Sequence, residues 1–201
     1  MIIMKKIFAL LLATMAVSSL ASGQFTKAGA GLGFTTGFPF HQQTWENNQS
    51  SKIDLFAKGI YEITLPLHIS PSFTWIVPHI TKSEIDGSSE KTSVSAIMFD
   101  INGHYVFNSL DRFEFYGLAG HDIMLARKKF VSDFSNNTYK SVEKDNALGL
   151  NVGLGTYIKV TNQFDIFVEA KYLVSKYDQF MVNAGLLLNL EWLSKNENPG
   201  I

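Results

Sequence analysis

Apolar and polar residues alternate along three long stretches in the C-terminal third of the chain. In the stretch 165–175, every second residue is apolar: Ile166, Val168, Ala170, Tyr172 and Val174. Glu169 and Lys171 lie between them, and the stretches 147–159 and 180–192 alternate in the same way. Because successive side chains of a β-strand point to opposite faces, this pattern predicts three strands that each have one fully apolar face.

The predicted strands are long for a soluble protein. Each runs for about 11 to 13 residues, whereas strands of globular proteins most often have about 5–6. A strand that crosses a membrane at a tilt near 45° needs about 9–11 residues. Strand length and the apolar face together favour a transmembrane β-barrel over a soluble sandwich.

The earlier part of the chain supplies five more predicted strands with less regular alternation. They cover about Phe25–Phe38, Ile53–Ile63, Leu67–Thr81, Ser93–Phe107 and Phe113–Arg127. Proline removes a donor from the sheet ladder, so Pro71 and Pro78 are expected at an edge or a bulge. Eight strands can close without leaving an edge and place both chain ends on the periplasmic side. The sequence therefore predicts an all-β fold, an eight-stranded antiparallel up-and-down transmembrane β-barrel over residues 24–192.

The connections between the predicted strands alternate in length. The short ones are expected to be periplasmic turns, at 64–66, 108–112 and 161–163. The long ones are polar and are expected to be extracellular loops, at 40–52, 82–92 and 128–146. The segment 176–179 is a short exception. Aromatic residues near the strand ends are expected to form the interfacial girdles: Phe113, Tyr116, Phe164 and Trp192.

The N-terminal segment 1–23 has the features of a secretory signal peptide. Lys5 and Lys6 precede an apolar run over 7–17, and small residues follow before an expected cut at Gln24. The run is too short for a transmembrane helix, which needs about 20 apolar residues. The chain has no cysteine, so it lacks the acylation site of a lipoprotein. We expect export, a mature barrel in the cell outer membrane and a C-terminal tail over 193–201.

Four consecutive segments near the C-terminus resemble the small outer-membrane β-barrel domain family. They are Gly149–Tyr157, the turn Thr161–Asp165, Phe167–Tyr172 and Asn183–Asn189, whose spacing of glycine, tyrosine and glutamate is similar to the closing hairpins of that family. The start at Gln24 and the overall layout resemble the Bacteroidetes branch, which includes PorT-like proteins. The resemblance implies an architecture related to OmpA, OmpX and OmpW. It implies no common catalytic residues.

Ionisable and polar residues are expected on the lumen faces of the predicted strands. The set is Asp54, Lys58, Glu62, Asp100, His104, Asn151, Glu169 and Lys171. An eight-stranded barrel is only wide enough for its own side chains to fill, so these groups are expected to pair across the interior. Buried carboxylates need cationic or hydrogen-bonding partners, which Lys58, Lys171 and Arg112 could supply. A proton or ion path through the lumen is the alternative.

Catalytic and cofactor chemistry finds little support in the sequence. His79 with Ser83 and Glu84, and His121 with Asp122, are the candidate groups for a hydrolase or acyltransferase at the rim. His41 and His68 complete the five histidines, and no group of residues has metal-ligand spacing, so we expect no catalytic, cofactor or metal site. The glycines in 29–33 lack the βαβ context of a nucleotide loop.

Three functional hypotheses follow. The first is a non-enzymatic outer-membrane β-barrel with a structural or surface-interaction role, or a narrow conduit for small apolar solutes. The second is a periplasmic lipocalin-like carrier of a small hydrophobic ligand, whose charged face would have to point outward. The third is the rim-located enzyme. Expected partners of the barrel are outer-membrane lipid, lipopolysaccharide and the outer-membrane assembly machinery. A formal net charge of −1 and only two arginines argue against nucleic acid.

Overall fold

The computed structural model describes residues 25–40, 49–85, 88–134, 137–190 and 192. The expected signal peptide, its cut before Gln24 and the tail 193–201 lie outside these residues. The eight strands are β1 (Phe25–Thr35), β2 (Ile53–Thr64), β3 (Leu67–Ile85), β4 (Ser88–Leu110), β5 (Phe113–Phe134), β6 (Asn137–Lys159), β7 (Phe164–Ser175) and β8 (Gln179–Asn189).

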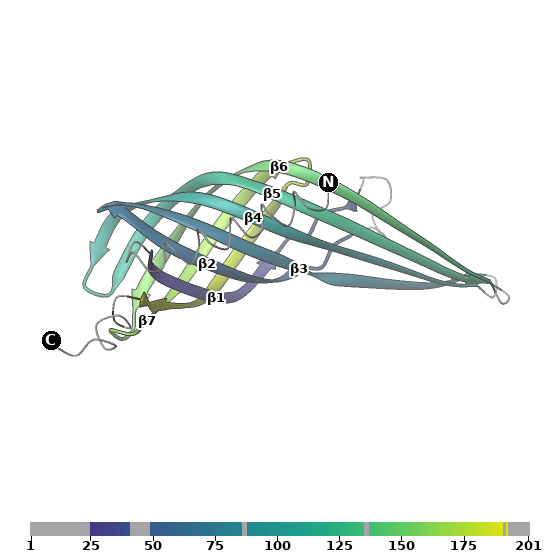
Figure 1. Cartoon of the computed structure of the whole chain (residues 1–201), viewed down its shortest axis with the longest axis horizontal. Helices are drawn as coiled ribbons and strands as arrows, with labels where there is room; N and C mark the ends of the chain where they lie inside the picture. Colours follow the sequence, from purple (N-terminus) through teal and green to yellow (C-terminus); the bar gives the residue numbers. More distant parts are fainter. Residues whose placement is uncertain (1–24, 41–48, 86–87, 135–136, 191, 193–201) are drawn as a thin grey trace, which may run out of the picture.

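The strands form one closed ring in chain order, and each strand runs antiparallel to its neighbours. The pairing of β1 with β8 closes the barrel, with Ala28 opposite Leu188 and Leu32 opposite Ala184. Figure 1 shows the tilted strands of the ring and, at one end, the longer strands that extend beyond it. The predicted eight-stranded antiparallel barrel is therefore confirmed.

The two faces of each strand differ as the alternation predicts. On β7, Val168 and Tyr172 are 39% and 43% exposed, whereas Glu169 and Lys171 between them are 3% and 2% exposed. The same division holds on β6 and β8, where the leucines and valines other than the buried Leu187 point outward. An apolar exterior around a charged interior is what a barrel in lipid requires, and it is the reverse of what a soluble carrier needs. Among the described residues no helix is both long and apolar enough to cross a membrane.

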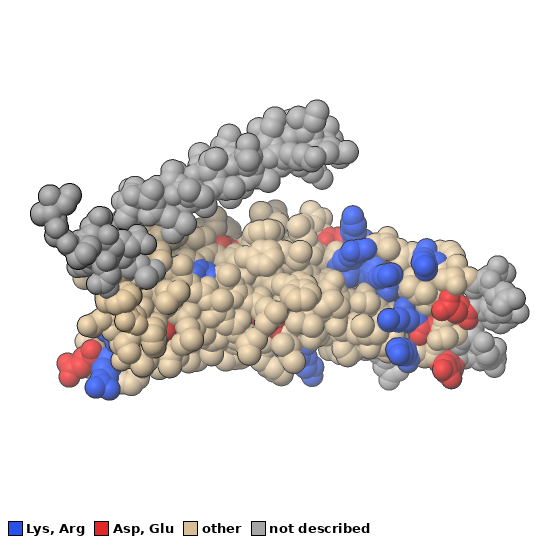
Figure 2. All heavy atoms as spheres, turned by 60° about the horizontal axis from the view of Figure 1, so that its bottom comes forward, with Lys and Arg blue, Asp and Glu red and all other residues tan. Residues whose placement is uncertain are grey.

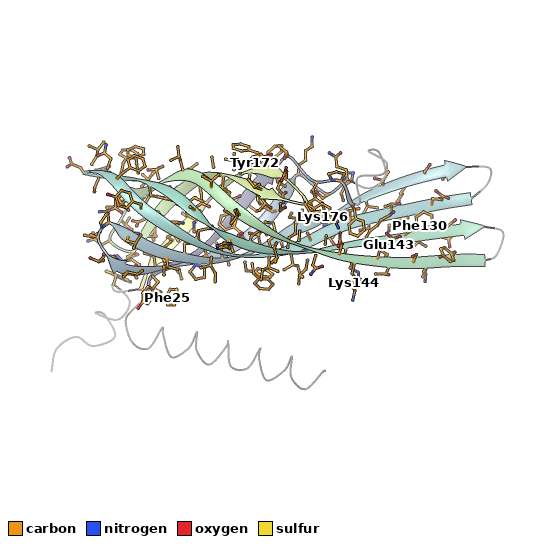
Figure 3. The ribbon with its side chains drawn as sticks, turned by 90° about the horizontal axis from the view of Figure 1, so that it is seen from above. Phe25, Phe130, Glu143, Lys144, Tyr172 and Lys176 are labelled. Atoms are coloured by element: carbon orange, nitrogen blue, oxygen red, sulfur yellow. The ribbon has the colours of Figure 1, made fainter. Side chains whose placement is uncertain are left out.

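Two of the predicted loops are instead parts of strands. The described parts of the segments 82–92 and 128–146 continue the β3–β4 and β5–β6 hairpins, whose pairing extends to Ile85 opposite Ser88 and Phe134 opposite Asn137. The four strands project together beyond the barrel as one sheet (Figures 1 and 3). The polar composition of these segments suggested loops. A strand that leaves the membrane, however, no longer needs an apolar outer face.

Both prolines of β3 interrupt its pairing. At Pro71 the β2–β3 pairing has a gap between Lys58–Ser72 and Tyr61–Ile69. At Pro78 a bulge adds one residue to β3, so that Ile76 pairs with Ala96 but His79 pairs with Val94. Directly paired residues share a face of the sheet, and Val94 is buried. His79 therefore lies on the inner face of the hairpin, whereas uninterrupted alternation from Ile76 would place it on the outer, lipid-facing side.

Candidate functional site in the lumen and on the hairpins

The lumen is filled in layers, and the layer nearest the short turns is aromatic. Tyr116 and Tyr157 stack with ring centroids 4.4 Å apart, and the His104 ring stacks on Tyr116 at 4.5 Å. Gly155 leaves the space for this stack, because a Cβ there would lie 2.3 Å from Cζ of Tyr116. Tyr116 is fully buried and is not the girdle residue expected from its place near a strand end. Phe113, by contrast, is exposed on the outer surface.

The middle layer contains two buried ion pairs. Lys58 Nζ lies 2.7 Å from Glu169 Oε2, and both side chains are 3% exposed. The Tyr116 hydroxyl donates to the same oxygen at 3.0 Å, and His104 Nε2 lies 4.0 Å from it. The Glu169 carboxylate is therefore held by a cation and a hydroxyl from strands on other sides of the ring.

The second ion pair joins Lys171 Nζ to Asp100 Oδ2 at 3.0 Å. Ser72 Oγ donates to the same carboxylate at 2.9 Å, and Asn151 Nδ2 donates to Asp100 Oδ1 at 3.0 Å. Asn151 also donates to Asn102 at 3.0 Å. These contacts bear out the expected pairing of Asp100, Asn151 and Lys171 across the interior.

Two further carboxylates of the same layer have no hydrogen-bond partner among the described residues. Asp54 and Asp122 are 0% and 1% exposed, and Asp122 pairs directly with Asp100 across β4 and β5. The side chains of Asp54 and Asn183 both lie against Gly33. A Cβ atom added at Gly33 would lie 2.3 Å from an oxygen of each. Gly33 of β1 thus makes room for two larger inward side chains.

An apolar layer, called the cap below, closes the lumen at the hairpin end, from which β3 to β6 project. It contains Phe38 and Phe40 from the segment after β1, Tyr177 from the β7–β8 turn, and Met98 and Met124. Lys176 Nζ and the Tyr177 hydroxyl both donate to the carboxylate of Asp145, beside the cap. These two hydrogen bonds lower the pKa of Asp145 to about 2. Thr35 Oγ1 donates to Gln179 Oε1 at 2.6 Å below the cap.

Several predicted site residues do not join these clusters. Glu62 and Arg112 are exposed at the turn end, so the expectation that Arg112 neutralises a lumen carboxylate is wrong. His121 points outward and Asp122 inward, which separates that pair. His68 is buried near the aromatic layer, 6.5 Å from Tyr157 between ring centroids. His41 lies outside the described residues.

The proposed hydrolytic group around His79 is not assembled either. Ser83 shares the inner face of the hairpin with His79 but lies four residues further along the strand, about 13 Å away. Glu84 lies on the opposite face. The part of the chain that the structure describes holds no cluster of three or more histidine, cysteine or acidic side chains suited to a metal ion.

Four further members of the lumen network were not predicted from the sequence: Tyr116, Tyr157, Asp122 and Asn183. Asn183 alternates with outward residues of β8, so its lumen position could have been predicted. The facing of Asp122 was harder to predict, because both faces of β5 mix apolar and polar residues near it.

The projecting sheet is the second candidate site. Among the described residues, β2 pairs with β3 only as far as Ile76, and β7 pairs with β6 only from Gly149. The β3 segment 77–85 and the β6 segment 137–148 therefore form its two outer edges. An edge strand of this kind can pair with another extended chain.

A closed ring of eight strands with an apolar exterior defines a membrane-spanning β-barrel protein. The family described as outer membrane protein beta-barrel domain matches residues 7–192, and the chain belongs to this family. Its place is therefore the outer membrane.

Solved structures share the fold at low sequence identity. The attachment invasion locus protein Ail of Yersinia pestis, solved in complex with the heparin analogue sucrose octasulfate, is 16% identical with a TM-score of 0.52. The alignment covers 81% of this chain and 99% of Ail. A major outer membrane protein from Thermus thermophilus is 11% identical with a TM-score of 0.56, over 82% of this chain and 98% of that one. No curated protein matches the chain.

Proposed function

We propose that this protein is a non-enzymatic outer-membrane barrel whose role is structural and surface-directed. The barrel anchors a four-stranded sheet that projects from the hairpin end to the outside of the cell. The observation that carries the proposal is the continuation of β3 to β6 beyond the ring, with two long edges that no other described strand pairs with. Residues 1–23 are removed on export, and the outer-membrane assembly machinery inserts the mature barrel into the membrane.

The filled lumen supports an anchoring role more than a conduit for apolar solutes. A solute would have to pass the aromatic layer around Tyr116, the ion pairs of Glu169 and Lys171, and the cap around Tyr177. These groups are all buried and in contact with other side chains. Lumen ion pairs that link opposite strands stiffen the barrel on which the sheet stands.

The open edges indicate the kind of partner. An extended segment of another protein can add a strand to an edge through backbone hydrogen bonds. Lys82 on β3 and Lys140 on β6 place charges at the edges, which limits aggregation between copies of the sheet. We therefore propose extended peptide segments as partners at the edges, while outer-membrane lipid surrounds the barrel.

A register-preserving deletion tests the proposal. Ile80 pairs with Ser93, and Lys129 pairs with Val142, so replacing 81–92 and 130–141 by Asn-Gly turns removes the ends of both hairpins and keeps the remaining pairs. Vesicles containing the full or the shortened chain are bound to immobilised reduced, carboxymethylated albumin, which offers extended segments. We expect the full chain to bind and the shortened chain to lose binding. Equal binding by both chains, with both folded by gel mobility, would contradict the proposal.

A further inference from the structure

The charges of the projecting sheet are divided between its two faces. Six basic side chains lie on the outer face, which continues the lipid-facing surface of the barrel: Lys82, Lys91, Arg127, Lys129, Lys140 and Lys144. All six are exposed. Figure 2 shows lysine and arginine side chains gathered along the hairpin end, with acidic side chains nearer its tip.

Like charges face each other on this outer surface. Lys82 pairs directly with Lys91, and Arg127 pairs directly with Lys144. Like charges opposite each other destabilise an antiparallel pair of strands. Within the described part of the chain, none of the six has a carboxylate at ion-pair distance.

The inner face of the same sheet has its basic groups matched by acidic ones. Lys128, the neighbour of Arg127 and Lys129, pairs directly with Glu143. Lys176 from the β7–β8 turn binds Asp145 on this side. In the part that the structure describes, the outer face carries two acidic residues near its tip, Glu84 and Asp133, against its six basic ones. The excess positive charge of the sheet therefore belongs to its outer face.

On β5 the basic residues begin after the last exposed apolar residue, while Ile80 and Val142 keep the outer face partly apolar in the row of Lys129. Leu125 is the last exposed apolar residue of β5 before Arg127, and Lys129 follows on the same face. Two residues span about 7 Å along a strand, which is about 5 Å of height at a tilt near 45°, so Arg127 and Lys144 lie about 5 Å above this apolar boundary. Headgroups extend about 5–7 Å from each side of a bilayer's hydrocarbon core. The first basic pair is therefore at headgroup height, and the others reach beyond it.

We infer that this basic outer face binds the phosphate groups of glycolipid headgroups in the surrounding outer leaflet. The inference rests on the proposed function, because it takes the hairpin end to be the outer one. Phosphates would neutralise the like-charged pairs that the chain itself leaves unmatched. Contact from the side favours a lipid over a soluble polyanion, because these residues continue the surface that faces the bilayer.

Two neighbouring lysines on opposite faces provide the test. Lys129→Gln removes a charge from the outer face, and Lys128→Gln removes one from the inner face. A single cysteine at Val142, on the outer face opposite Lys129, carries a fluorescent label, since the chain has no cysteine of its own. Folded, labelled protein in phosphatidylcholine vesicles is titrated with the phosphorylated glycolipid lipid A, and the change in fluorescence gives the apparent affinity.

We expect Lys129→Gln to weaken binding about fivefold, the usual contribution of one basic residue near an anionic surface. Lys128→Gln should change it less than twofold, and the triple replacement of Arg127, Lys129 and Lys144 by Gln should weaken it about 100-fold. Equal effects of Lys128→Gln and Lys129→Gln would overturn the inference, as would equal affinity for a dephosphorylated glycolipid.

A soluble heparin-type polysaccharide added to vesicles without the glycolipid separates the two sources of anionic groups. We expect the polysaccharide to bind only weakly and added salt to abolish this binding. Binding as tight as that of lipid A would reassign the face to soluble polyanions and overturn the lipid assignment. This experiment does not depend on which end of the barrel faces outward or on strand addition. Its failure is therefore distinct from failure of the proposed function.

Discussion

Replacing Glu169 by Gln should destabilise the barrel far more than the same change of an exposed ion-paired carboxylate. The change keeps the shape of the side chain and an oxygen for the Tyr116 hydroxyl, but leaves the ammonium of Lys58 buried without its counter-ion. At 2.7 Å and an effective dielectric constant of 20, Coulomb's law gives about 6 kcal/mol for the attraction. Breaking a buried pair typically costs about 3–5 kcal/mol after solvation is included, so we expect a loss of about 3 kcal/mol.

The measurement is denaturant unfolding of the protein in lipid vesicles, followed by tryptophan fluorescence. Glu114→Gln is the matched control, because Glu114 pairs with Lys159 at the same 2.7 Å but that lysine is 47% exposed. Its loss should stay below about 1 kcal/mol. The double variant Lys58→Met with Glu169→Leu should recover much of the unfolding free energy that Glu169→Gln loses. Equal costs for Glu169→Gln and Glu114→Gln, or a double variant as unstable as the sum of its single changes, would refute the reasoning.

Three further predictions use the same unfolding assay. Ala170→Arg puts a cation on the lipid face near the middle of β7 and should cost about 2–4 kcal/mol, whereas Lys171→Arg should cost much less; equal costs would mean that the faces are assigned wrongly. Gly155→Ala should cost about 1–3 kcal/mol, because its Cβ would overlap the Tyr116 ring, and a neutral result would contradict the close approach. The pKa of Asp145 is lowered to about 2, so its carboxylate stabilises the fold above its ordinary pKa of 3.8, and this contribution is lost as the pH falls through about 2. Asp145→Asn should therefore be less stable than the natural chain by up to about 1 kcal/mol at pH 7 and equally stable near pH 2; a constant difference would contradict the assignment.

The sequence predicted the strands best where lipid imposes the pattern. On β7 and β8 an unbroken apolar face alternates with lumen residues, so both the strands and their facing were predicted correctly. The projecting parts of β3 to β6 were missed because no hydrocarbon surrounds their outer face, and lysine and serine then take the places of leucine and valine. The dipeptide Asp86-Gly87, a common hairpin turn sequence, could have indicated the shorter connection.

The partners within the lumen were beyond prediction for a different reason. The alternation predicted that Lys58 and Glu169 point inward, but they are 111 residues apart in the chain. Which inward residues meet depends on strand tilt and on the register of every hairpin around the ring. The bulge at Pro78 illustrates the difficulty, since one extra residue moved His79 to the other face.

Labelling of single cysteines on intact cells tests the central claim most directly, namely that the barrel presents its projecting sheet outside the cell. Cysteine replaces Val142 on the sheet in one variant and Ser109 at the turn end in the other, and both residues are exposed. A membrane-impermeant maleimide should label the Val142→Cys protein on intact cells and the Ser109→Cys protein only after the outer membrane is permeabilised. Labelling of Ser109→Cys on intact cells, with Val142→Cys protected, would contradict the account.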